Sequence, residues 1–237
     1  MSQLNPRQQE AMQYVSGPLL VLAGAGSGKT SVITRKIAYL IEECQMPAER
    51  ITAVTFTNKA AREMKARVQK LLPSDKTKGL TVSTFHQFGL QFLRYELLHT
   101  PLKGNFSIMD AEDSKRLLMD LMVRDNMSGA ESRELVGKAI KMISDWKNDL
   151  IPPEKAADTL TDPEDMLFAT LYQLYERNLR AYNAVDFDDL IVMPTRLLQE
   201  NTQVRDKWQN RIRYLLVDEY QDTNTAQYEL IKLLVGV

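Results

Sequence analysis

The stretch PLLVLAGAGSGKT, residues 18–30, decides the fold because it joins an apolar run to a glycine-rich turn and a Lys-Thr pair. This order of strand, turn and helix start is typical of a phosphate-binding loop. Small residues let successive backbone N–H groups turn toward an anion, and a helix starting near Lys29 directs its positive end at the same place. The general pattern begins with glycine, whereas this chain has Ala23 there. The alternative interpretation is a glycine-rich turn that only closes a strand-helix unit.

The loop predicts a site for a nucleoside triphosphate and a divalent cation. Lys29 is expected to hold the β- and γ-phosphates, and Thr30 is expected to ligate Mg²⁺. The chain is therefore predicted to be a nucleotide triphosphatase. The residues expected to bind the nucleotide here are Ala23, Gly24, Ala25, Gly26, Ser27, Gly28, Lys29 and Thr30.

Two carboxylates, Asp218 and Glu219, directly follow the apolar run of residues 212–217. The carboxyl ends of strands are where ligands bind in open α/β sheets. We expect Asp218 to hold Mg²⁺, directly or through water, and Glu219 to orient and deprotonate the attacking water. The alternative is a polar strand-to-helix junction in which Asp222 and Thr223 cap the last helix.

Apolar periodicity predicts an α/β fold in which a parallel sheet is wrapped by helices. From residue 86 to about residue 209 the pattern is helical with no convincing strand, which predicts a helical subdomain inserted into the α/β part. The expected strands are Leu19–Ala23, Ile51–Phe56, Leu80–Phe85 and Ile212–Val217. The expected helices around them are Pro6–Val15, Lys29–Glu43, Asn58–Leu72 and Thr223–Leu234.

Composition is that of an ordinary globular protein, with 44% hydrophobic and 26% charged residues among 237. Cys44 is the only cysteine, so no intramolecular disulfide can form. No apolar run approaches the length that spans a bilayer, and the first residues lack the pattern of a secretory leader. The sequence therefore predicts a cytoplasmic protein without a membrane partner.

Charge is unevenly distributed along the chain. The first 85 residues are net basic and the remainder is net acidic, with the basic excess concentrated between Lys59 and Lys78. Such a stretch suits a nucleic-acid backbone or a polyphosphate. The alternative is a solvated helix face, because apolar residues recur through it at helical spacing.

Five motifs occur in the order and spacing of the superfamily 1A DNA helicases of the UvrD/Rep/PcrA family, which the chain resembles over its whole length. They are Leu4–Gln8 (adenine-reading motif), Ala23–Thr30 (motif I), Thr55–Ala61 (motif Ia), Ser83–His86 (motif Ib) and Val217–Asn224 (motif II). Three further segments carry the resemblance within that family: Ser144–Asp149, Asp186–Leu190 and Trp208–Tyr214.

The resemblance implies a 3′→5′ ATP-dependent helicase that moves on single-stranded DNA and unwinds duplex at single-strand/double-strand junctions. It implies that Gln8 reads the adenine edge, since a primary amide presents a donor and an acceptor together. Phe56 is similar to an aromatic residue that stacks on a base, although an aromatic side chain that ends a strand often belongs to the core. The residues that resemble positions near the DNA backbone are Thr57, Asn58, Lys59, Thr84 and His86, of which His86 is equally compatible with a buried structural role.

The resemblance also implies an organisation. Motor domain 1A, a RecA-like P-loop NTPase sheet with helices on both faces, is expected in residues 1–85 and 196–237, and the inserted all-helical subdomain 1B in residues 86–195. The family continues into a second motor domain that supplies arginines to the ATP site, and no segment of this chain resembles it. The chain is therefore expected to be an incomplete helicase whose partner is the missing C-terminal motor domain.

Two other classes of function remain open at this point. The chain could be a module that binds nucleotide or single-stranded DNA without catalysis, or another phosphate-loop enzyme such as a nucleotide kinase or a DNA-repair ATPase. Turnover by the fragment separates a helicase motor from a binding module. DNA-stimulated turnover in the full-length protein separates a helicase motor from another phosphate-loop enzyme.

Overall fold

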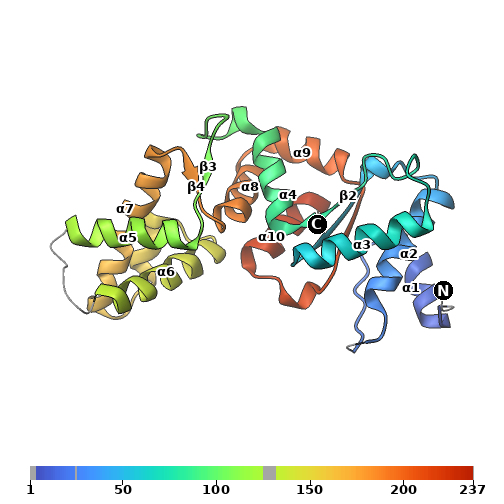
Figure 1. The fold of residues 1–237 in the computed structure, drawn as a ribbon, viewed down its shortest axis with the longest axis horizontal. Coiled ribbons are helices and arrows are strands. Elements are labelled where there is room, and N and C mark those ends of the chain that lie inside the picture. Colours follow the sequence, from blue (N-terminus) through green and yellow to red (C-terminus); the bar gives the residue numbers. More distant parts are fainter. Residues whose placement is uncertain (1–3, 25, 125–131, 237) are drawn as a thin grey trace. The chain divides into compact units, whose positions relative to one another are not determined.

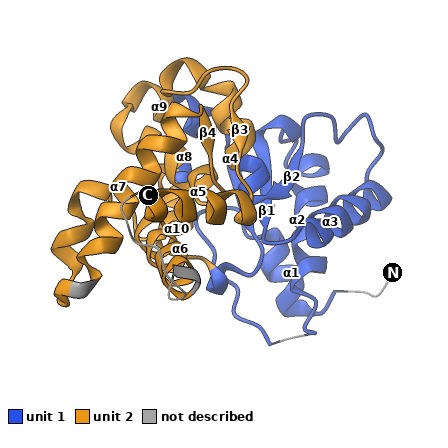
Figure 2. Ribbon diagram, turned by 60° about the vertical axis from the view of Figure 1, so that its left-hand side comes forward, with its two compact units in different colours: residues 1–88, 206–222, 234–237 blue, residues 89–205, 223–233 orange. Residues whose placement is uncertain are grey.

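The computed structural model describes residues 4–24, 26–124 and 132–236. These residues form two compact units, shown in different colours in Figure 2. Unit 1 consists of residues 1–88, 206–222 and 234–237, and unit 2 of residues 89–205 and 223–233. The boundaries expected from the sequence, 1–85, 86–195 and 196–237, stay predictions. No helix in the described part of the chain is both long enough and apolar enough to cross a bilayer.

Unit 1 contains a parallel sheet of three strands in the order β2-β1-β5, as an α/β fold requires. The strands are β1 (Ile51–Thr55), β2 (Thr81–Thr84) and β5 (Tyr214–Val217). In the register of the sheet, Ala53 lies opposite both Val82 and Leu216. All of β1 is buried, which is typical of a central parallel strand.

Helices α1 (Pro6–Gln13), α2 (Lys29–Glu42) and α3 (Asn58–Leu71) belong to unit 1. Helices α2 and α3 lie side by side (Figure 1) and bury Ile37, Leu40, Met64 and Val68 against alternate residues of β1 and β5. This spacing of three and four residues is that of an amphipathic helix. The short helices η1 (Ala48–Arg50) and η5 (Tyr220–Asp222) complete the unit, and α4 (Phe85–Tyr95) and α9 (Thr202–Arg211) span the boundary between the units.

The expected strand Leu19–Ala23 is not formed. Residues 18–24 join no sheet, and Leu19, Leu20, Val21 and Leu22 are all exposed, Leu22 with 86% of its surface open. A buried parallel strand needs hydrogen bonds to a neighbouring strand and cover on both faces. Among the described residues this segment has neither, so its apolar composition alone does not make it a strand.

Unit 2 is built mainly of helices: α5 (Ala111–Arg124), α6 (Ser132–Asn148), α7 (Met166–Ala181), α8 (Asp189–Glu200) and most of α10 (Thr225–Val235). Short helices η2 (Leu97–His99), η3 (Pro153–Thr159) and η4 (Pro163–Asp165) connect them. The core of α5, α6 and α7 includes a stacked pair, Trp146 and Tyr172, with ring centroids 5.7 Å apart. The Trp146 indole N–H donates to the Thr159 hydroxyl at 2.9 Å, so this buried ring leaves no donor unsatisfied.

Two short strands correct the expectation that residues 86–209 contain none. β3 (Ser107–Ile108) and β4 (Ala184–Val185) form a parallel pair. Each has only two residues, too few to show a period-two pattern in the sequence.

Candidate nucleotide and nucleic-acid site

The glycine-rich loop of unit 1 adopts the tight backbone that its composition allows. Gly26 has φ 74° and Gly28 has φ 84°, in the left-handed region that residues with a Cβ rarely adopt. Gly28 is the N-cap of α2, so the helix begins at Lys29. The Lys29 ammonium donates to the carbonyls of Ala23 at 2.9 Å and Gly24 at 3.2 Å. The lysine side chain thus lies back over its own loop.

Ala25 lies outside the described residues. Gly24, Gly26 and Ser27 are exposed, and the Ser27 N–H donates to the Gly24 carbonyl at 3.3 Å across the turn. No Cβ contact within 4 Å would arise at Gly24 or Gly26. The space around these two residues is open to a ligand.

The structure brings Thr30 and Asp218, which are far apart in the sequence, into contact. The Thr30 hydroxyl donates to Asp218 Oδ2 at 3.3 Å, and Asp218 is buried at the end of β5. Burial and the neighbouring Glu219 raise the pKa of Asp218 above its usual value. A hydroxyl and a carboxylate side by side are oxygen ligands of the kind that Mg²⁺ prefers.

Glu219 has φ 51°, an unusual conformation for a residue with a side chain. Its N–H donates to Asp218 Oδ1 at 3.2 Å, and its own carboxylate accepts a hydrogen bond from the Gln221 amide. The two successive carboxylates have different partners: Asp218 accepts from Thr30, and Glu219 accepts from Gln221. The Asn224 side chain accepts from the Gln227 N–H at 2.9 Å and caps α10, the role that the alternative interpretation gives to Asp222 and Thr223.

Gln8 lies next to the glycine-rich loop. Asn5 and Gln8 form a reciprocal capping box at the start of α1, and the Gln8 side-chain amide donates to the Ser27 carbonyl at 2.8 Å. A Cβ added at Gly28 would lie 3.1 Å from Gln8 Nε2. The glutamine and the loop are therefore packed closely together.

Thr57, Asn58 and Lys59 are all exposed at the start of α3. The Thr57 hydroxyl caps the helix by accepting from the Ala60 N–H at 3.1 Å. The basic residues of α3 that follow, Arg62, Lys65, Arg67 and Lys70, are exposed as well, while Met64 and Val68 are buried. The helix therefore combines a solvated basic face with an apolar core face, as the alternative interpretation of its charge also expects.

Phe56 is half-buried, with its ring centroid 5.3 Å from that of Phe85. Phe85 is fully buried, so Phe56 lies at the edge of the core and exposes only part of its ring. Thr84 is buried, and its hydroxyl accepts from the Gln87 N–H at 3.2 Å at the start of α4. His86 is half-buried. Thr84 thus has a clear structural role, and Phe56 has both core and surface character.

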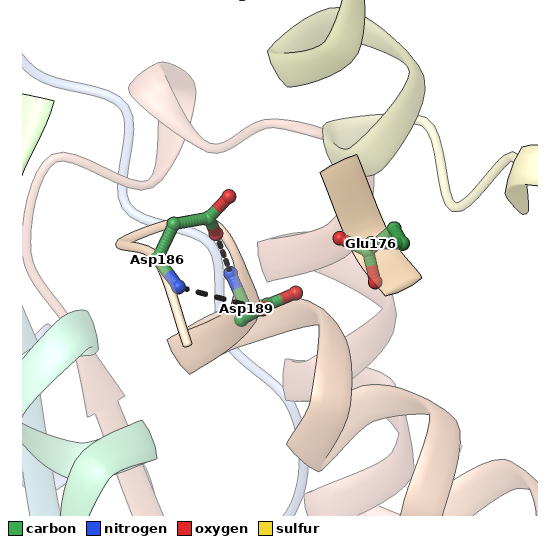
Figure 3. A group of neighbouring side chains, drawn as sticks. All are labelled: Glu176, Asp186 and Asp189. Atoms are coloured by element: carbon green, nitrogen blue, oxygen red, sulfur yellow. Dashed lines mark hydrogen bonds between the residues drawn. The ribbon is translucent and has the colours of Figure 1, made fainter. Parts of the chain in front are cut away.

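The sequence interpretation missed a cluster of three carboxylates in unit 2, of which Asp186 and Asp189 are buried and Glu176 is half-buried. Figure 3 shows Asp186 and Asp189 on one turn, joined by hydrogen bonds between backbone and side chain, with Glu176 opposite them on α7. Oxygen atoms of these three residues lie within 4.8 Å of one another, close enough to share a cation.

Lys147 supplies that cation from within the chain. Its buried ammonium lies 2.5 Å from Glu176, 2.7 Å from Asp186 and 3.0 Å from Asp189, and Arg180 contacts Asp189 at 2.7 Å. Burial and Asp189 raise the pKa of Asp186 to about 6, whereas Lys147 and Arg180 hold the pKa of Asp189 below its usual value. The cluster is an internal ion network in which two cations of the chain, Lys147 and Arg180, face the three carboxylates.

Comparison with known proteins identifies the family to which the chain is similar. Residues 4–237 match the family described as the UvrD/REP helicase N-terminal domain. The chain is 54% identical over 98% of its length to the ATP-dependent DNA helicase Rep of Escherichia coli K12, and 42% identical over its full length to the ATP-dependent DNA helicase PcrA of Staphylococcus aureus. It covers 34% of the first relative and 32% of the second, about a third of their length.

Proposed function

The chain belongs to the UvrD/REP helicase family, and from this premise we propose that it is the N-terminal motor half of an ATP-dependent DNA helicase. The observation that carries the proposal is the contact between Thr30 and Asp218 at 3.3 Å. It brings the phosphate-binding loop and the carboxylate pair into one site, as a nucleotide triphosphatase requires.

In the proposed site, Lys29 leaves the carbonyls of its own loop and binds the β- and γ-phosphates of ATP. Thr30 and Asp218 would hold Mg²⁺, which neutralises charge on the phosphate oxygens when it is bound. The residues present fit this ion, because Asp218 is a buried carboxylate with the Thr30 hydroxyl beside it. Glu219 orients the attacking water and accepts its proton. Gln8 reads the adenine edge beside Ser27.

For the fold we propose a RecA-like motor domain 1A, interrupted by helical subdomain 1B. Support comes from the parallel order β2-β1-β5, with Asp218 directly after β5, and from the mainly helical unit 2, which separates the two main segments of unit 1 in the sequence. The family match over residues 4–237 supports the same organisation.

Single-stranded DNA is the proposed second ligand. Thr57, Asn58 and Lys59 are exposed and would contact its backbone, and the open part of the Phe56 ring would stack on a base. Thr84 and His86 are proposed near the same path, Thr84 through its position at the start of α4, since its hydroxyl is engaged there. Translocation with 3′→5′ polarity and unwinding at single-strand/double-strand junctions are proposed for the protein that includes a second motor domain.

A second candidate function is binding of nucleotide or DNA without catalysis. The observation that favours it is that the chain spans about a third of the length of its relatives. In this case ATP and DNA bind to residues 1–237, and turnover requires the rest of the helicase.

Equilibrium binding of a fluorescent ATP analogue to the 237-residue chain, with Mg²⁺ and with EDTA, tests the nucleotide site. Lys29→Ala should weaken binding by about 10- to 100-fold, because a charge-assisted hydrogen bond contributes roughly 1.5–3 kcal/mol. Glu219→Gln should keep the affinity for Mg-ATP, since it leaves Asp218 and Thr30 intact, and should abolish turnover when placed in the full-length helicase. Unchanged affinity in the Lys29→Ala variant would overturn the proposal, and equal loss of affinity in both variants would overturn the separate role of Glu219.

A further inference from the structure

Helix α1 ends in a set of carbonyl groups that a single lysine satisfies. The Lys36 ammonium donates to the carbonyls of Ala11 at 2.9 Å and Met12 at 3.3 Å, and makes a still closer contact with the carbonyl of Tyr14. The last carbonyls of a helix have no partner within the helix and carry its negative dipole end. All three ammonium protons are therefore matched by acceptors at the end of α1.

Lys36 is an unusual residue for its position. It belongs to the buried stripe of α2, next to Ile37, and only 5% of its surface is exposed. Burial lowers its pKa. A lysine that is withdrawn from water in this way needs a specific set of acceptors, which α1 provides.

A second side chain reaches the same point from the sheet. The Tyr214 hydroxyl of β5 donates to the Tyr14 carbonyl at 3.2 Å, and the Lys36 ammonium lies 5.5 Å from the centre of the Tyr214 ring. The carbonyls after α1, Lys36 and Tyr214 together form what we call the α1 clamp.

The clamp joins the three elements that carry the proposed nucleotide site. Helix α1 begins with Gln8 in its first turn, α2 begins at Lys29, and Asp218 directly follows β5. At its other end α1 is held by the hydrogen bond from Gln8 to the Ser27 carbonyl. With both ends fixed, the distance between the Gln8 amide and the phosphate-binding loop is set by the packing of α1 on α2.

We propose that Lys36, assisted by Tyr214, is a positioning residue for base recognition: it fixes α1 so that the Gln8 amide meets the adenine edge of a nucleotide bound at the phosphate loop. The inference rests on the proposed function, since it requires that Gln8 reads the base. Lys36 does not touch the nucleotide. Its loss should therefore reduce discrimination between bases and leave the binding of phosphates unchanged.

The test compares the affinities of the 237-residue chain for Mg-ATP, Mg-GTP and Mg-tripolyphosphate, the last of which has no base. Gln8→Ala should reduce the preference for ATP over GTP by about 5- to 10-fold, the value of one or two neutral hydrogen bonds. Lys36→Met should reduce it by a similar factor and leave tripolyphosphate binding unchanged. Lys155→Met, at an exposed position in unit 2, is the matched control and should change neither quantity.

The outcomes separate the inference from the proposed function. If Gln8→Ala lowers the preference and Lys36→Met does not, the clamp has no role in base recognition and the function stands. If Gln8→Ala keeps the preference, Gln8 does not read the base and both statements fail. Should Lys36→Met not fold, Tyr214→Phe, which removes one hydroxyl, should still lower the preference by about 2- to 5-fold, the value of one hydrogen bond. An unchanged preference in folded Tyr214→Phe would contradict the clamp.

Discussion

In the proposed DNA site, Phe56 and Lys59 would make two contacts of different physical kinds. Stacking of a base on Phe56 releases no counterion. Lys59 would neutralise a phosphate and so release the counterion bound to that phosphate. We expect Phe56→Ala to weaken single-strand binding by roughly 1–3 kcal/mol at every salt concentration. Lys59→Ala should weaken binding and also make the negative slope of log K against log salt shallower by about 0.7.

Titrations of a labelled oligonucleotide at several salt concentrations measure both effects. Melting curves serve as the control, because the Phe56 ring lies 5.3 Å from that of Phe85 and its loss also affects packing. Unchanged DNA affinity in a folded Phe56→Ala variant would assign this ring to the core alone.

Lys147 is the central cation of three carboxylates, two of which are buried, so we expect its removal to destabilise the fold. Lys147→Met leaves Glu176, Asp186 and Asp189 without their central cation and should lower the free energy of unfolding by about 3–5 kcal/mol. The pKa of Lys147 is raised above its ordinary value, so its contribution is fully present at neutral pH and is lost only as pH rises through that raised pKa.

Urea unfolding of Lys147→Met, with the exposed Lys155→Met as the matched control, measures the loss. A difference below about 1 kcal/mol between the two variants, the range of a surface pair, would show that the network does not stabilise the fold.

Site residues could be predicted from the sequence where they form a motif with their immediate neighbours. The GSGKT stretch and the Asp-Glu pair were predictable in this way, and the structure brings Thr30 and Asp218 together at 3.3 Å. Lys36 and Lys147 were not predictable, because the partners of Lys36 lie 22 to 25 residues away along the chain and those of Lys147 lie 29 to 42 residues away. A lysine inside an apolar stripe is the one signal that was present in the sequence.

At the scale of elements, the ends predicted from periodicity lie within about two residues of the observed ends for strands β1, β2 and β5 and for helices α1, α2, α3 and α10. The wrong prediction at residues 19–23 shows what composition leaves out: it describes how a strand is buried, whereas strand formation also requires hydrogen bonds to a neighbouring strand. In the described sheet β5 pairs with β1 and not with this segment.

Helices α4 and α8 approach each other at a glycine, and this close contact gives a matched pair of substitutions. A Cβ at Gly89 would lie 1.7 Å from the Leu190 carbonyl oxygen, whereas a Cβ at Gly137, an exposed position of α6, meets nothing within 4 Å. Gly89→Ala should therefore destabilise the protein by more than about 1–3 kcal/mol, the usual cost of overpacking.

Gly137→Ala should stabilise the protein by up to about 1 kcal/mol, since alanine is the better helix former. The melting temperatures of the two variants, measured by thermal unfolding, test both predictions. A melting temperature for Gly89→Ala at or above that of the unsubstituted chain would contradict the close approach of α4 to α8.

For the whole molecule, the distribution of charge and the placement of the site agree. Residues 1–85, which include the phosphate-binding loop and the exposed basic face of α3, are net basic, and the rest of the chain is net acidic. Positive charge therefore gathers in the part of the sequence proposed to bind two polyanions, ATP and DNA. Total charge, which is −1, hides this asymmetry.

The charges that the chain places around the proposed ATP site predict how the isolated chain behaves. Phosphoryl transfer is accelerated chiefly by charges around the transferred group, and an arginine supplied by another domain raises the rate by about 10³–10⁵ in nucleotide triphosphatases. Residues 1–237 provide Lys29, Thr30, Asp218 and Glu219, and cover about a third of the relatives' length. We expect this chain to bind Mg-ATP weakly, to hydrolyse it at a small fraction of the rate of the full-length helicase, and to unwind no duplex.

Steady-state ATPase assays with and without single-stranded DNA measure the KM for Mg-ATP and the rate of hydrolysis. A strand-displacement assay measures unwinding. Strong DNA-stimulated turnover by the purified chain would show that its catalytic site is complete without a second motor domain.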